Sequence, residues 1–174
     1  AEQKTLGNGV TLTVTQLNTE DADWGVDNAV PVWGFAVAAD AQKFGRRQFK
    51  SVDFPVELFH ISVGGQHDEL VLEVMSYIST TPRALRHIRK LVVTFYDYNG
   101  GCATGWNNVL RVAQAPWYIV TGFDVAFPPG SVARLHAHMN ENRAIDAVKN
   151  GFVVFAKHSF FCAFAVTQAV VDTV

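Results

Sequence analysis

Two histidines set one residue apart, His136 and His138, are the sharpest chemical feature of the sequence. They lie within residues 115–171, where apolar runs are broken by Pro128-Pro129-Gly130 and by Asn150-Gly151. Short apolar runs bounded by Pro and Gly are typical of buried β-strands. Residues two apart on a strand project from the same face, so both imidazoles could bind one metal ion.

The spacing of Gly130, five residues and then the His-x-His pair resembles the first half of the first cupin motif. That resemblance implies a metal-dependent enzyme on a jelly roll, with a third ligand, usually Glu, separated from His138 by three or four residues. The chain has Asn142 and Arg143 at those positions, and Glu141 is one position short. Two other interpretations stay open, a contact to a polar ligand and two histidines bonded to carbonyls or hydroxyls, and we expect no bound metal or cofactor.

A second group of candidates follows Tyr98 in a segment rich in glycine and asparagine, residues 99–108. Trp106, Asn107 and Asn108 lie within this segment, which we expect to be a loop. An aromatic ring can stack on the apolar face of a sugar while neighbouring amides bind its hydroxyls. These four residues, together with His136 and His138, are therefore the predicted ligand-binding residues.

The motifs of several enzyme classes are missing. The sequence contains no Gly-x-Ser-x-Gly, no P-loop and no Gly-x-Gly-x-x-Gly, and we find no convincing general acid–base pair. Its two cysteines, Cys102 and Cys162, could form a disulfide or be buried thiols. The absence of catalytic motifs favours a binding protein over an enzyme.

The composition and charge of the chain limit which kinds of partner it is expected to bind. The 174 residues are 49% hydrophobic and 17% charged, with a formal net charge of −2. Nucleic-acid binding is not expected because it requires a basic surface. We expect a homo-oligomer, since charge is scarce, and no membrane span, because Lys157 and His158 interrupt the longest apolar stretch. The start at Ala1, without Met, is compatible with a removed signal peptide or initiator Met, and we expect an extracellular or surface location.

The hydrophobic pattern predicts nine or ten strands. Gly64-Gly65 follows the strand expected over residues 54–63, and residues 69–79 are the expected hairpin partner of that strand. A short helix is predicted to begin at Thr81. A second short helix or crossing loop covers residues 141–149. The expected strands outside the hairpin partner cover residues 10–16, 30–38, 54–63, 91–98, 109–113, 117–127, 152–155 and 160–166.

This pattern predicts an all-β fold, an antiparallel β-sandwich of jelly-roll type with one or two short helices, and residues 1–174 as one domain. We therefore expect a non-enzymatic, lectin-like oligomer that binds carbohydrate or a cell surface. One alternative is a self-assembling structural subunit, such as a viral coat, tail or surface-layer component. The other is a cupin-like metal-dependent enzyme that uses His136 and His138.

Overall fold

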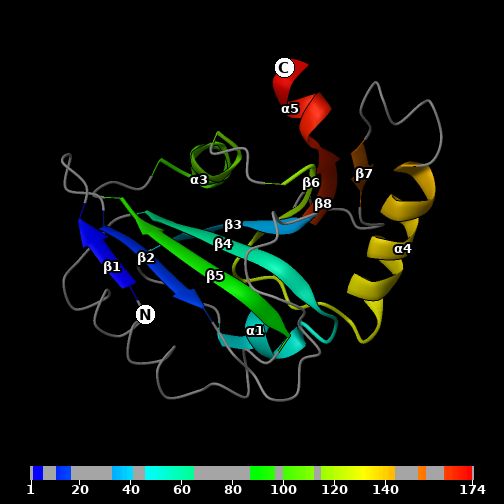
Figure 1. Ribbon diagram of the computed structural model, residues 1–174, viewed down its shortest axis with the longest axis horizontal. Helices are drawn as coiled ribbons and strands as arrows, with labels where there is room; N and C mark the ends of the chain where they lie inside the picture. The colour runs from blue at the N-terminus through cyan, green and yellow to red at the C-terminus, as the bar shows by residue number, and fades with distance from the viewer. Residues whose placement is uncertain are drawn as a thin grey trace.

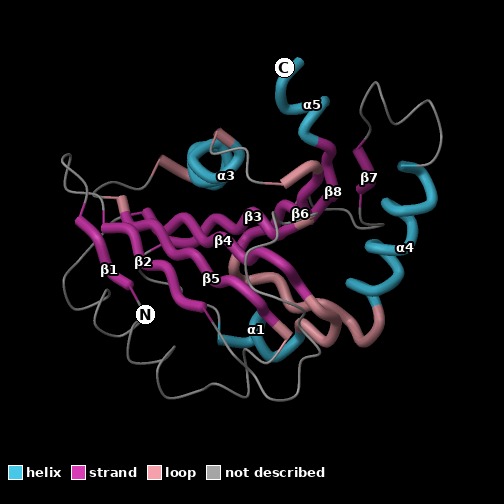
Figure 2. The backbone as a smooth tube through the Cα atoms, in the orientation of Figure 1, coloured by secondary structure: helices cyan, strands magenta, loops and turns pink. Residues whose placement is uncertain are grey.

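The computed structural model describes residues 2–5, 11–16, 33–40, 46–64, 87–96, 100–111, 115–143, 153–155 and 163–173. Within them the chain forms a single eight-stranded sheet with helices on both faces (Figures 1 and 2). The strands are β1 (Glu2–Thr5), β2 (Thr11–Gln16), β3 (Gly34–Asp40), β4 (Val56–Gly64), β5 (Ile88–Phe95), β6 (Trp117–Gly122), β7 (Val153–Phe155) and β8 (Ala163–Thr167). The helices are α1 (Arg46–Ser51), α3 (Cys102–Leu110), α4 (Ser131–Arg143) and α5 (Gln168–Thr173).

The centre of the sheet is parallel. The strand order is β1-β2-β5-β4-β3-β6-β8-β7, and β5, β4, β3 and β6 pair in parallel. The flanking strands β1, β2, β8 and β7 pair antiparallel. The predicted all-β antiparallel sandwich is therefore wrong: the fold is α/β with a mixed sheet. The prediction failed because strands that are covered on both faces have continuous apolar runs in a parallel sheet as well as in a sandwich.

The strand order reverses between β3 and β6. From β3 the chain continues to β4 and then β5 in one direction, and it then crosses back to β6 on the other side of β3. Right-handed crossovers that run in opposite directions place their helices on opposite faces of the sheet. Figure 1 shows this arrangement, with α1 on one face and α3 on the other. The boundary between β3 and β6 is a topological switch point, where α/β proteins commonly bind ligands.

The side chains of β3 differ in size between its two faces. Phe35 and Val37 pack with Phe49 of α1 in the larger hydrophobic cluster. Ala36 belongs to the second cluster, together with Val109 of α3. The small side chains on the second face allow α3 to lie close to the sheet, which decides where the pocket described below can form.

Several local predictions are corrected. The segment 99–108, expected to be a loop, contains most of helix α3, and the strand expected over residues 109–113 starts inside that helix. Ile88 begins β5, so the helix predicted from Thr81 does not continue to this position. The predicted hairpin partner, residues 69–79, lies outside the described residues. No helix in the described part of the chain is long and apolar enough to cross a membrane.

Candidate functional site

The carboxyl ends of the parallel strands form one edge of the sheet. β3 ends at Asp40, β4 at Gly64 and β5 at Phe95, while Gly122 ends β6 on the other side of the switch point. In open α/β sheets, ligands bind in the crevice outside these ends. This edge is therefore where the fold favours a ligand site.

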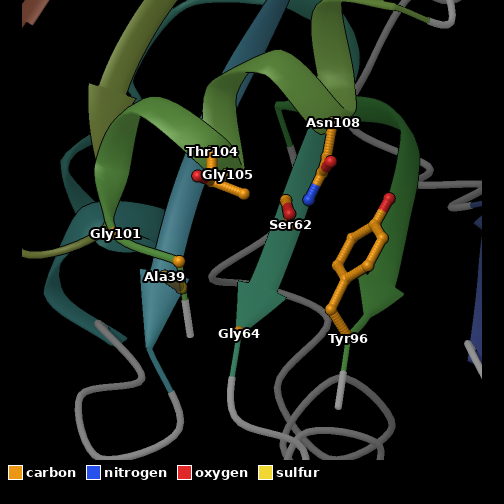
Figure 3. Close-up of a pocket in the computed structure, with 9 residues that line it drawn as sticks. Ala39, Ser62, Gly64, Tyr96, Gly101, Thr104, Gly105 and Asn108 are labelled. Carbon is orange, nitrogen blue, oxygen red and sulfur yellow. The ribbon is translucent and has the colours of Figure 1, made fainter. Parts of the chain in front are cut away.

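A small, open pocket lies at this edge, between the ends of β3 and β4 and the first turns of α3, and its empty space of about 210 Å³ includes open solvent. Figure 3 shows that the side chain of Asn108 extends from α3 toward Ser62, beside the ring of Tyr96. The lining therefore combines a hydroxyl, an amide, a phenol and exposed backbone. The full lining is Ala39, Ser62, Gly64, Tyr96, Gly100, Gly101, Thr104, Gly105 and Asn108.

Ser62 is the most informative residue of this pocket. Its side chain is only 1% exposed, and its Oγ has no hydrogen-bond partner among the described residues. A buried hydroxyl without a partner costs about 1–3 kcal/mol, so native proteins rarely keep one without a reason. Because this hydroxyl lines an open pocket, a bound ligand could supply its partner.

The N-terminus of α3 meets the same pocket. Gly101 is the N-cap with φ 89°, and no side chain in the described part of the protein caps the helix. A left-handed φ favours glycine, and a Cβ added to Gly101 would meet nothing within 4 Å. The first backbone N–H groups of a helix carry partial positive charge and bind anions well. Gly101 and Thr104 both line the pocket, so this N-terminus borders the space that a ligand would occupy.

Close packing sets the position of α3. A Cβ added to Gly105 would lie 2.8 Å from Ala38 Cβ and 3.9 Å from Ser62 Oγ. Trp106, the next residue, donates a hydrogen bond from Nε1 to the Thr121 carbonyl at 3.0 Å. Its ring also meets Phe164 edge-on, with the ring centroids 5.5 Å apart. These contacts fix α3 over β3 and β6 and so define the height of the pocket.

A turn at the end of β6 presents a carboxylate. Phe123 is buried and packs edge-on against Phe49, with centroids 5.0 Å apart. The next residue, Asp124, is exposed, and a Cβ added to Gly122 would lie 2.8 Å from its Oδ1. The carboxylate is therefore folded back over the end of β6. β3 lies between β6, which carries this turn, and β4, which lines the pocket. The carboxylate is therefore about two strand spacings, or roughly 10 Å, from the β4 side of the pocket.

A neutral polar pair lies in the sheet, two residues from Ser62. His60 Nε2 lies 3.2 Å from Thr94 Oγ1, and Thr94 Oγ1 donates to the Ile61 carbonyl at 3.3 Å. Burial, together with the smaller effect of the Lys90 charge, lowers the pKa of His60 to about 4. The imidazole is therefore uncharged at neutral pH and serves as a buried hydrogen-bonding group.

The predicted residues of the glycine- and asparagine-rich segment separate in the structure. Asn108 lines the pocket, whereas Asn107 is exposed on α3. Trp106 is half-buried and holds the helix to β6 and β8. Tyr98 lies outside the described residues. The structure thus brings one of these four candidates to the pocket, alongside Ser62, which the sequence did not single out.

His136 and His138 lie on helix α4, so the prediction that they share one face of a strand is wrong. Residues two apart on a helix point about 200° apart, which prevents both imidazoles from reaching one ion. His136 packs on Trp33, Phe54 and Trp117, with ring centroids 5.0, 4.9 and 5.8 Å away. Burial lowers the pKa of His136, and the charge of Glu57 partly opposes this. His138 is exposed.

Known proteins resemble this chain in structure only. No protein-family model matches the sequence, and no curated protein matches it. The fold resembles Staphylococcus aureus TarS 1–349, with a TM-score of 0.56 and 14% identity, over 80% of this chain and 48% of that one. It also resembles the mannosyltransferase PcManGT of Pyrobaculum calidifontis in complex with GDP-Man and Mn²⁺. There the TM-score is 0.57 with 14% identity, over 88% of this chain and 50% of that one.

The chain therefore spans about half the length of these two structures. At such identities the likeness concerns the fold, and it agrees with the α/β architecture derived above. The lectin-like interpretation and the two alternatives, a structural subunit and a cupin-like enzyme, were all tied to an all-β sandwich or jelly roll. They are corrected together with that fold, because the sheet is a mixed α/β sheet and not a sandwich.

Proposed function

We propose that this chain is the nucleotide-binding part of a sugar transferase. A sugar nucleotide would lie along the carboxyl edge of the sheet, from the pocket at Ser62 to the turn at Asp124. The buried Ser62 hydroxyl, which has no hydrogen-bond partner among the described residues, lies beside the N-terminus of α3 and carries this proposal. The likeness to PcManGT, a mannosyltransferase in complex with GDP-Man, supports the same class of ligand.

The polar side chains around the pocket offer contacts to the nucleoside end of such a ligand. The Asn108 amide can both donate and accept, and the hydroxyls of Ser62 and Tyr96 can do the same. Ribose hydroxyls and base edges need such mixed partners. The Tyr96 ring also offers an aromatic face at the pocket wall.

The diphosphate end needs positive charge. The N–H groups at the start of α3 can bind phosphate oxygens without any side chain. The described residues contain no group of three potential metal ligands, but Asp124 fits as the single carboxylate for a divalent cation. Magnesium-type sites often use one or two carboxylates and complete their coordination with substrate phosphates and water. When bound, such a cation would neutralise charge on the leaving diphosphate.

In this reaction the bond between the sugar C1 and the diphosphate oxygen breaks, and a new bond forms between C1 and an acceptor oxygen. The acceptor loses its proton, and the nucleoside diphosphate leaves with the electron pair. The residues described here bind and orient the donor and stabilise the leaving charge. Asp124, at the switch point, is the residue we place nearest the diphosphate.

The test is the release of nucleoside diphosphate from UDP- and GDP-sugars, with and without Mn²⁺. We expect the wild-type chain to cleave at least one donor and Asp124→Asn to be slower by about a hundredfold, the loss typical for an electrostatic stabiliser. Asp172→Asn is the matched control, because Asp172 is an exposed carboxylate on α5 that bonds only Gln168 in the described contacts. A folded wild-type chain that neither binds nor cleaves any of these donors would contradict the proposal.

A further inference from the structure

The buried side chain of Gln48 reaches the Asp124 turn from the opposite face of the sheet. Gln48 lies on α1 and is 0% exposed. Its Nε2 donates to the Gly122 carbonyl at 2.9 Å and to the Val125 carbonyl at 2.8 Å. These two carbonyls flank Phe123 and Asp124, so a single amide group bridges both ends of the turn.

The orientation of this amide follows from its partners. Two carbonyls can only accept hydrogen bonds, so the nitrogen of Gln48 and not its oxygen must face them. Both N–H groups of the amide are then used. The Gly122 carbonyl also accepts a hydrogen bond from Thr121 Oγ1 at 3.0 Å. The Val125 carbonyl, in contrast, has Gln48 as its one side-chain donor among the described contacts. Removing the amide would therefore free the Val125 end of the turn first.

Two further bonds attach the following segment to the same region. Ser51 Oγ accepts from Phe127 N at 3.0 Å and donates to the Gln48 carbonyl at 2.7 Å. Asp53 Oδ2 accepts from Gly130 N at 3.0 Å. Both anchors lie beyond the turn, so among these three contacts only the Gln48 amide brackets Asp124.

The core explains why the turn needs this bridge. Phe123 is buried against Phe49, the neighbour of Gln48 on α1, while Asp124 points outward. Burial of Phe123 and its backbone bond from N to the Ala38 carbonyl at 2.9 Å fix where the turn enters the core. Within the turn, Val125 N donates to the Gly122 carbonyl at a long 3.4 Å. The two hydrogen bonds from Gln48 to the carbonyls on both sides reinforce this weak closure.

We propose that Gln48 is a positioning residue that holds the Gly122–Val125 turn so that Asp124 faces the ligand edge. What Asp124 meets there rests on the proposed function, but the positioning itself does not. α1 thus acts on the site from the face opposite the pocket, through the Gln48 hydrogen bonds and the packing of Phe49 on Phe123.

The first experiment measures amide hydrogen exchange in wild type, Gln48→Met and Ser51→Ala, without ligand. Gln48→Met keeps the side-chain length and removes both donors. We expect exchange at Asp124 and Val125 to accelerate by about tenfold, as for the loss of one net hydrogen bond. Ser51→Ala should leave these two amides unchanged and affect Phe127 instead. Unchanged exchange at Asp124 and Val125 in Gln48→Met would overturn the proposal.

A second variant covers the case in which Gln48→Met fails to fold. Gln48→Glu has nearly the same shape, but its carboxylate cannot donate at neutral pH. We expect rapid exchange of the turn at pH 8 and partial recovery as the new carboxyl gains a proton and can donate one bond. Exchange that is the same as wild type at pH 8 would contradict the positioning role.

The third measurement separates positioning from general stability. UDP and GDP affinities are compared with and without Mn²⁺ in wild type, Gln48→Met, Asp124→Asn and the double variant. We expect Gln48→Met to reduce the Mn²⁺-dependent gain in affinity, and to have no further effect once Asp124 is replaced. Equal losses in both backgrounds would overturn the proposal. If wild type binds neither nucleotide, the proposed function fails, and the exchange experiment still decides the role of Gln48.

Discussion

Gly105 of α3 and Ala38 of β3 are in such close contact that a methyl group on Gly105 would lie 2.8 Å from the Ala38 Cβ. Real Cβ atoms do not approach each other this closely, so any side chain at Gly105, or a larger one at Ala38, would lift the helix from the sheet. The pocket lies between this helix and the strand ends, and Gly105 is part of its wall. Two small residues therefore set the dimensions of the proposed binding site.

The first prediction concerns Gly105→Ala. Alanine favours a helix over glycine by about 1 kcal/mol, but overpacking a rigid contact typically costs about 1–3 kcal/mol. We expect a net decrease in the free energy of unfolding, measured by urea denaturation. Ala103→Gly is a control on the exposed side of the same helix, where only helix propensity should change. Gly105→Ala at or above wild-type stability would show that the contact is not tight.

Trp106 is predicted to stabilise the fold through two separable contacts. Trp106→Phe removes the bond from Nε1 to the Thr121 carbonyl but keeps an aromatic ring, and it should cost about 1 kcal/mol. Trp106→Ala also removes the ring from Phe164 and should cost about 3–5 kcal/mol. Thermal and urea unfolding of both variants test this. Similar stability of the Ala variant and wild type would contradict the anchoring role.

The buried His60 makes stability depend on pH. Its folded pKa of about 4 lies below the unfolded value of 6.5, so between these values the unfolded chain binds more protons. Stability should therefore decline as the pH falls from 6.5 to 4, by about 3 kcal/mol for this residue. His60→Gln should show a flatter profile over this window. Parallel profiles for the two proteins would mean that His60 titrates normally.

Gly122 and Gly34 should respond differently to alanine. A Cβ on Gly122 meets the end of the flexible Asp124 side chain at 2.8 Å, whereas one on Gly34 meets the Leu58 carbonyl oxygen at 2.9 Å. Because a side chain can move more readily than a strand backbone, Gly122→Ala should change stability by less than about 1 kcal/mol. It should nonetheless displace the carboxylate and weaken Mn²⁺-dependent nucleotide binding. Gly34→Ala should destabilise the fold, and equal effects on stability would contradict this distinction.

The sequence predicted individual strands better than their arrangement. The run from Val56 to Val63 carries large apolar residues in both of its alternating registers, as expected for a strand covered on both faces, and the structure confirms a strand there. Its neighbours in the sheet, β3 and β5, depend on crossovers that periodicity does not encode. A parallel sheet and a sandwich core therefore gave the same local pattern.

Helix α3 was missed for a different reason. It begins after two glycines and contains Gly105, Asn107 and Asn108, all residues of low helix propensity. Its packing against Ala38 and the anchoring of Trp106 override that propensity. Asn108 was nevertheless among the candidate ligand contacts, because an amide in a glycine-rich segment is suited to polar recognition. Ser62 gave no such signal, since only the tertiary structure buries its hydroxyl without a partner.

The most direct measurement is the binding of UDP and GDP, with Mn²⁺, by titration calorimetry of wild type, Asn108→Ala and Asn107→Ala. These neighbouring asparagines differ in one respect that matters here, because Asn108 lines the pocket and Asn107 faces solvent. We predict that wild type binds at least one nucleotide, that Asn108→Ala weakens binding by about tenfold, and that Asn107→Ala does not. Equal affinities for all three proteins would place the nucleotide elsewhere, and no binding to wild type would contradict the account.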